Sequence, residues 1–285
     1  MWIMYAFGSA FFAGITAVLA KIGIKDVDSN LATALRTIVI LIFSWLMVFI
    51  VGSFNTIFII ETKTLVFLVL SGMATGLSWL CYFKALQLGN VNNVTPIDKS
   101  STILTMVLAM LFLNEAFTVL KGISIVLIGV GTYMMIEKKK DTDTKSESWL
   151  IYACGSAVFA SLTSILGKIG ISGVESNLGT AIRTVIVLIM AWVVVAVTKK
   201  AKEIKNIDKK SWIFLILSGL TTGLSWLCYY KALQEGEASI VVPIDKLSIL
   251  VTIAFSYFIL HEKMTKKSLL GLVGIVIGTF LLLVK

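Results

Sequence analysis

The sequence predicts an all-α integral membrane protein with ten transmembrane helices, arranged as two inverted repeats of five helices. Its composition, its apolar segments and an internal repeat support this prediction. Of the 285 residues, 58% are hydrophobic and 14% are charged, whereas a soluble domain has roughly half apolar and about a quarter charged residues. A globule of this size cannot bury so many apolar side chains, so we expect much of the surface to face lipid.

Ten apolar segments are long enough to cross a bilayer. A spanning helix needs about 20 mostly apolar residues. The expected spans are 2–24, 31–51, 64–86, 91–113 and 118–136 in the first half, and 149–171, 178–198, 211–233, 238–260 and 266–284 in the second. These segments are continuous apolar runs and not alternating ten-residue strands, which excludes a transmembrane barrel.

The two halves repeat each other at a constant offset of 147 positions. Residues 75–82 return at 222–229, and the Pro-Ile-Asp-Lys element at 96–99 returns at 243–246. We therefore expect a first repeat at 1–137, a polar linker at 138–148 and a second repeat at 149–285. Because five crossings are an odd number, the second repeat starts on the opposite side of the membrane. This inversion is typical of secondary transporters, whose substrate site lies near the midplane between the repeats.

Several features resemble the EamA-type drug/metabolite transporters: the two five-helix repeats, the glycine-rich first helix, a lysine-rich loop before the third helix and a glutamate-bearing turn after the fourth. The resemblance covers essentially the whole chain, and each half is similar to a complete single-repeat member. It implies a ten-helix carrier or exporter of small metabolites. The shared features specify the fold better than the substrate.

The lysines predict an orientation in a cell (inner or plasma) membrane. Loops after odd-numbered helices hold 14 of them and the opposite side holds 3. The positive-inside rule then places both termini outside the cytoplasm, whereas the family resemblance implies cytoplasmic termini. We follow the charge count, because the loop at 199–210 is much richer in lysine than its counterpart at 52–63.

Polar residues inside the apolar segments indicate a pathway, because a charge at membrane depth costs about 3 kcal/mol on insertion scales. Serine and tyrosine four positions apart share a helix face, and a tryptophan beside them can form an aromatic wall or simply pack. The Pro-Ile-Asp-Lys element either starts a helix or kinks one next to a cavity. The candidate pathway residues are Arg36, Arg183, Asp98, Asp245, Lys99, Lys246, Ser78, Tyr82, Ser225, Tyr229, Trp79 and Trp226.

Other chemistry is disfavoured. His261 is the single histidine and has no cysteine near it, so we expect no metal site, no cofactor and no enzyme activity. The basic residues lie at the ends of apolar segments and do not form a nucleic-acid-binding patch. The three cysteines lie in apolar stretches, which argues against a disulfide framework.

The expected membrane spans contain 8 basic residues and 2 acidic residues at membrane depth. This excess favours an amino-acid-like or carboxylate-bearing substrate, moved by a secondary carrier through alternating access between the repeats. We expect the fused chain to work as a monomer in the lipid bilayer, coupled to a proton or another ion if it is coupled at all. An anion channel or passive pore, a small-multidrug-type cation exporter and a non-transporting scaffold are the alternatives.

Overall fold

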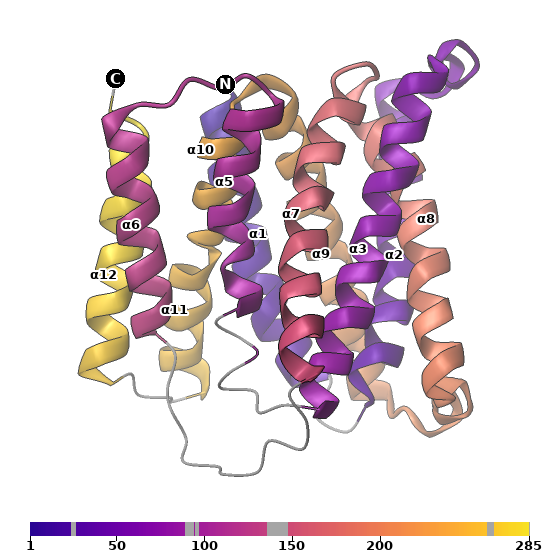
Figure 1. The fold of residues 1–285 in the computed structure, drawn as a ribbon. Coiled ribbons are helices and arrows are strands. Elements are labelled where there is room, and N and C mark those ends of the chain that lie inside the picture. The colour runs from indigo at the N-terminus through magenta and orange to yellow at the C-terminus, as the bar shows by residue number, and fades with distance from the viewer. Residues whose placement is uncertain (24–26, 89–93, 95–96, 136–147, 261–264, 285) are drawn as a thin grey trace.

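A computed structural model describes residues 1–23, 27–88, 94, 97–135, 148–260 and 265–284, and every regular element in these ranges is helical (Figure 1). Six helices are long and apolar enough to cross a membrane. They are α1 (Trp2–Gly23), α2 (Ser29–Val51), α3 (Thr62–Leu88), α7 (Ser148–Ile171), α8 (Ser176–Thr198) and α9 (Lys209–Glu235). The chain is therefore a multi-pass membrane protein.

The other helices are shorter: α5 (Ser101–Phe112), α6 (Val119–Met134), α10 (Ala238–Lys246), α11 (Ser248–Leu260) and α12 (Lys266–Leu281). Two 3-10 helices, η1 (Phe54–Ile59) and η2 (Lys200–Asn206), follow α2 and α8. A helix of 16 residues such as α6 is shorter than the roughly 20 residues that span a bilayer unaided. A total of ten spans therefore stays a prediction.

Local sequence sets where the helices begin and end. Asp28 caps α2 by accepting hydrogen bonds from the backbone N–H of Asn30 and Leu31, at 3.0 and 3.1 Å. The corresponding helix α8 begins after Glu175, whose carboxylate accepts from the N–H of Asn177 in the same way. These carboxylates satisfy N–H groups that have no partner within the helix. The helix α2 ends at Gly52, whose φ of 77° lies in the left-handed region that glycine adopts without strain.

The expected span at 238–260 is not one continuous helix, because it consists of two helices, α10 and α11, that meet at Leu247. Pro243 lies inside α10 and has no N–H to donate to the carbonyl one turn earlier. At the junction the N–H of Leu247 donates to the Ile244 carbonyl at 2.9 Å, which tightens the last turn. In this copy the proline therefore lies within a helix that is interrupted just after the Asp-Lys pair. Thr95 and Pro96 of the first copy lie outside the described residues.

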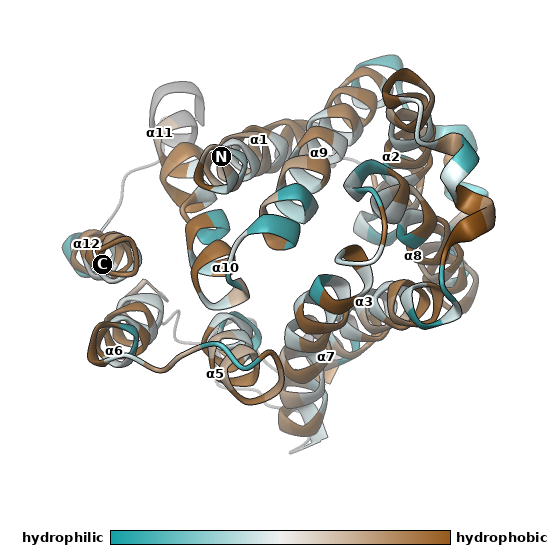
Figure 2. Cartoon of the chain, turned by 90° about the horizontal axis from the view of Figure 1, so that it is seen from above, coloured by the Kyte–Doolittle hydropathy of each residue, from teal (hydrophilic) through white to brown (hydrophobic). Residues whose placement is uncertain are grey.

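Each of the main pairs of packed helices joins a helix of the first half to a helix of the second. Helix α1 packs along α9 and α3 along α7, while α2 packs on α8 and α6 on α12. The 147-residue offset relates α1 to α7, α2 to α8, α3 to α9 and α6 to α12. The contact of α1 with α9 therefore corresponds to the contact of α7 with α3, and the other two contacts correspond to themselves when the halves are exchanged. This is the pattern that a two-fold axis produces. The α6–α12 pair lies at one edge of the molecule and the α2–α8 pair at the opposite edge (Figures 1 and 2).

Small residues allow close contacts between helices, and two glycines do so here. A Cβ on Gly76 of α3 would lie 2.3 Å from the Cβ of Met190 on α8. A Cβ on Gly219 of α9 would lie 2.8 Å from the Cβ of Val39 on α2. Gly76 and Gly219 therefore allow α3 to pack closely on α8 and α9 to pack closely on α2.

Large apolar side chains cover much of the outer surface. Ile42 on α2, Val126 on α6 and Leu270 on α12 are all exposed. Both termini lie at one end of the molecule, while η2 lies at the other (Figure 1). The lysine-rich segment is therefore on the side opposite the termini, and a broad apolar surface separates the two ends, as a bilayer requires.

Candidate functional site

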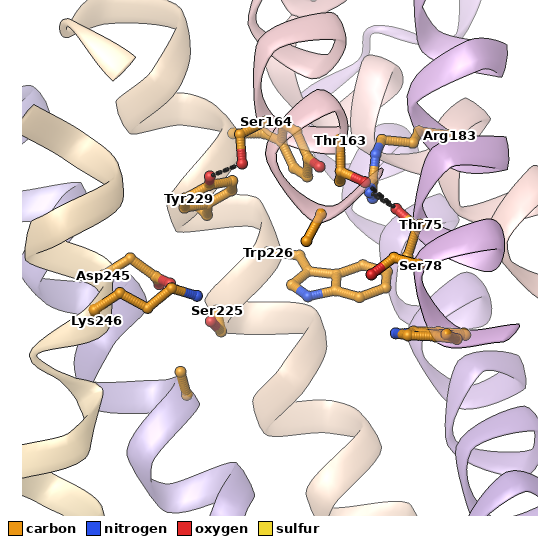
Figure 3. A pocket seen from close by; sticks show the side chains of 14 residues that line it. Thr75, Ser78, Thr163, Ser164, Arg183, Ser225, Trp226, Tyr229, Asp245 and Lys246 are labelled. Atoms are coloured by element: carbon orange, nitrogen blue, oxygen red, sulfur yellow. Dashed lines mark hydrogen bonds and ion pairs between the residues drawn. The ribbon is translucent and has the colours of Figure 1, made fainter. Parts of the chain in front are cut away.

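A cavity of about 280 Å³ lies between the two halves and is called here the central cavity (Figure 3). Helices α3, α7, α8, α9 and α10 contribute most of its wall. Its polar and aromatic lining comprises Thr75, Ser78, Trp79, Thr163, Ser164, Arg183, Ser225, Trp226, Tyr229, Tyr230, Asp245 and Lys246. The structure thus brings most of the candidate pathway residues together in one place.

Arg183 is the most firmly held charge in the central cavity. Its side chain is 2% exposed; Nε donates to Ser71 Oγ at 2.9 Å and Nη2 donates to Thr75 Oγ1 at 2.5 Å. The guanidinium also lies over the rings of Trp226 and Tyr230, at 5.4 and 4.7 Å from their centroids, where the ring quadrupole attracts a cation. Its Nη1 is buried without a hydrogen-bond partner among the described residues. A ligand oxygen that reached this donor would remove a desolvation cost.

Arg36, the repeat counterpart of Arg183, lines a second cavity of about 240 Å³, called here the Arg36 cavity. Its Nη2 donates to Thr222 Oγ1 at 2.7 Å. Trp79 and Trp226 line both this cavity and the central one. The two arginines therefore lie on either side of a shared aromatic wall, and each reaches from one half to a threonine of the other half.

Each aspartate of the Pro-Ile-Asp-Lys elements is held by a serine from the opposite half. Ser9 Oγ donates to Asp245 Oδ1 at 2.5 Å, and Ser156 Oγ donates to Asp98 Oδ1 at 2.7 Å. Neither serine is among the sequence candidates, although both are fully buried and are 147 positions apart. A serine that recurs in the same place of an apolar helix is the signal that finds them. Asp245 lines the central cavity, and Asp98 lies outside the three cavities described here.

Lys99 and Lys246 line a third cavity of about 450 Å³, called here the lysine cavity. Helices α1, α5, α6, α11 and α12 provide most of its wall. Lys246 and Ala13 also line the central cavity, so the two spaces adjoin. Lys246 Nζ lies 3.9 Å from Asp245 Oδ2, at the outer limit of an ion pair. Figure 3 shows Asp245 and Lys246 side by side at the edge of the central cavity.

Tyr82 and Tyr229, which are repeat counterparts, have different surroundings. Tyr229 lines the central cavity, where its hydroxyl lies 2.9 Å from Ser164 Oγ. Tyr82 packs beside the cluster of Ala85, Val94 and Ala153 and does not line any of the three cavities. The predicted polar face is therefore complete on α9 only.

Other membrane-level charges have structural partners. Lys168 Nζ donates to the carbonyl oxygens of Leu233 and Gly236 at the end of α9, and Lys231 forms an ion pair with Glu235 at 2.9 Å. Glu115, in the turn after α5, accepts from the N–H groups at the start of α10. A helix N-terminus presents unpaired N–H groups, and a nearby carboxylate satisfies them.

The described residues contain no group of three metal-ligating side chains, and the three cysteines are free. His261 lies outside the described residues. The three cavities contain a set of hydrogen-bond donors, two tryptophans and four basic groups. This arrangement can hold and orient a small solute that carries an anionic group.

The sequence model of the EamA-like transporter family matches residues 1–137 and 147–284. The chain belongs to the EamA-like transporter family. It is therefore a membrane transporter of the drug/metabolite transporter superfamily. The family match covers both halves, as the resemblance seen in the sequence implies.

Individual relatives agree with this membership. An uncharacterized transporter from the cobO 3' region of Sinorhizobium is 42% identical over 139 residues, which make up 49% of this chain and 99% of that protein. An uncharacterized protein of Methanocaldococcus jannaschii is 37% identical over 83 residues, 29% of this chain and 61% of its own length. A crystal structure of another protein matches 99% of this chain and 96% of its own, with a TM-score of 0.76 and 14% identity. This last similarity shows the fold alone.

Proposed function

We propose that this EamA-family protein is a secondary carrier of a small, amino-acid-like or carboxylate-bearing metabolite in the cell membrane. It works by alternating access between two inverted five-helix repeats that together make ten spans. The observation that carries the proposal is the central cavity, because the groups that hold its charges come from both halves. A solute bound there touches both repeats and can be passed between them.

The contacts between the halves support a movement of this kind. Arg183 from the second half donates to Ser71 and Thr75 of the first, and Asp245 accepts from Ser9 of the first. The repeat-related contact of Arg36 is weaker, with one hydrogen bond to Thr222. Two related halves therefore adopt unequal arrangements around the aromatic wall. Exchanging the two arrangements gives a second state that faces the other side of the membrane.

The charges in the central cavity support the substrate class. Arg183 and Lys246 line it together with one carboxylate, Asp245, which accepts a hydrogen bond from Ser9. A cationic solute would meet two positive groups there, whereas a carboxylate would meet donors. An anionic or zwitterionic solute with one carboxylate fits these charges best.

Counterflow tests the proposal. The protein is reconstituted in liposomes that are preloaded with unlabelled amino acids, organic acids or sugars, and uptake of the labelled solute is followed. We expect counterflow of a carboxylate-bearing solute. In Arg183→Gln it should fall roughly tenfold or more, because the central cavity loses a positive charge and the two hydrogen bonds from Arg183 to Ser71 and Thr75. Lys231→Gln is the matched control, since it removes one positive charge from α9 outside the three cavities.

Other outcomes would replace the proposal. An anion leak without counterflow would show a passive pore, because only a carrier exchanges solute on the two sides. Uptake of lipophilic cations driven by a proton gradient would show a cation exporter. The absence of both counterflow and leak for every solute in the panel would refute the carrier proposal.

A further inference from the structure

The lysine cavity has a distinctive chemical character. It lies between the α6–α12 pair and helices α1, α5 and α11, and its volume of about 450 Å³ falls within the range of small-molecule sites. Among the described residues that line it, Lys99 and Lys246 are the charged ones, and no carboxylate is present. The two ammonium groups in this cavity repel each other, while the Asp98 carboxylate attracts that of Lys99. An anion between them would turn that cost into an attraction.

The rest of the wall is mostly apolar. Ile128, Ile249 and Ile275 line the lysine cavity together with Met135, and the hydroxyls of Thr102, Thr132, Ser248 and Thr252 provide its remaining polar groups. A sugar phosphate would place several hydroxyl groups against this apolar wall, where each unpaired one costs free energy. An aliphatic or aromatic group would gain from the same contacts.

Each of the neighbouring aspartates accepts a hydrogen bond from a serine outside the lysine cavity. Asp98 accepts from Ser156 and Asp245 accepts from Ser9, and neither lines the lysine cavity. The Lys246 ammonium is 3.9 Å from Asp245 Oδ2, longer than the usual charge-assisted hydrogen bond of about 2.8 Å. An incoming anion can therefore approach Lys246 without displacing a short ion pair.

We propose that the lysine cavity binds an organic monocarboxylate with an apolar body, and that Lys99 and Lys246 together hold its carboxylate. The apolar body lies against the isoleucine wall. Because Lys246 also lines the central cavity, the bound carboxylate lies where the two spaces adjoin. As a statement about transport this rests on the proposed carrier function, but the binding itself can be measured without transport.

Equilibrium binding to the purified protein in phosphatidylcholine nanodiscs tests the proposal. Radiolabelled 4-phenylbutyrate is the probe, and 4-phenylbutanamide, hexanoate, hexanamide and inorganic phosphate are the competitors, with empty nanodiscs subtracted. We expect each carboxylate to compete roughly ten- to a hundredfold better than its amide, because the amide lacks the charge that the ammonium groups bind. Lys99→Gln/Lys246→Gln should abolish this preference, and Lys99→Arg/Lys246→Arg should retain it.

A second repeat-related pair provides the control. Lys84→Gln/Lys231→Gln also removes two positive charges, but at positions outside the three cavities, so the preference for the carboxylate should persist. Equal competition by acid and amide in the native protein would overturn the proposal without reference to any variant. So would an equal loss in the control pair, or phosphate competing as well as hexanoate. Lysine-dependent binding without counterflow would keep the site and reject the carrier. Counterflow of sugars without carboxylate binding would do the reverse.

Discussion

The contact between α6 and α12 should depend on the absence of a side chain at Gly271. A Cβ added there would lie 2.5 Å from the carbonyl oxygen of Gly131 and 2.9 Å from the Cβ of Met134. One turn along the same helix, a Cβ on Gly274 would meet its nearest atom, the Leu127 carbonyl oxygen, at 3.4 Å. Gly271→Ala and Gly274→Ala are therefore the same substitution in the same helix, with and without a clash.

The expected magnitude follows from this geometry. Relieving a contact of 2.5 Å to an ordinary separation moves the two backbones apart by somewhat under 1 Å. A gap of 0.5–1 Å forfeits roughly a quarter to a half of each dispersion contact along the pair. Overpacking of this kind costs about 1–3 kcal/mol, and in lipid no hydrophobic effect holds the helices together in compensation. Gly274→Ala carries no such cost and gains up to about 1 kcal/mol of helix propensity.

Thermal unfolding in nanodiscs, followed by circular dichroism, measures the difference. We expect Gly271→Ala to melt at a lower temperature than the native protein, and Gly274→Ala to melt at the same or a slightly higher temperature. Equal melting temperatures for the two variants would refute the close α6–α12 contact. A stabilised Gly271→Ala would do the same, since it would mean that space exists where the structure has backbone.

Two further predictions concern the N-terminal ends of helices, and a third concerns the orientation of the chain in the membrane. Glu115→Ala should destabilise the protein by about 0.5–2 kcal/mol in thermal unfolding, because α10 loses the carboxylate that accepts from its first N–H groups, whereas an unchanged melting temperature would mean that the contact does not form. Asp208 caps α9, and the Ser211 hydroxyl with the N–H groups of Ser211 and Lys210 lowers the pKa of its carboxyl below the ordinary 3.8. Asp208→Ala should therefore melt below the native protein at neutral pH, and the difference should disappear as the pH falls through that lowered pKa; a difference constant with pH would contradict this. A reporter that is active only in the cytoplasm should stay silent at the C-terminus and respond when inserted in η2, and the opposite result would reverse the predicted orientation.

Much of the candidate site could be listed from the sequence, because the duplication shows which polar residues recur. Arg36 and Arg183, the Asp-Lys pairs and the two tryptophans all recur at the same offset, and charges at membrane depth are too costly to persist without a use. Ser9 and Ser156 carry the same mark, yet their importance shows only when each is seen beside the aspartate of the other half. A serine hydroxyl can bond to the backbone of its own helix, so a serine in an apolar segment does not by itself indicate a partner in the other half.

By itself the sequence determined that the chain is helical and crosses a membrane, that it consists of two related halves, and which polar residues lie within them. These properties follow from composition, segment length and periodicity, which are local. The tertiary structure decided that α10 and α11 are separate helices, that Glu115 caps α10, and that Tyr229 lines the central cavity while Tyr82 does not. Repeat-related pairs such as Tyr82 and Tyr229 are identical in sequence, and only the packing of one half against the other gives them different partners.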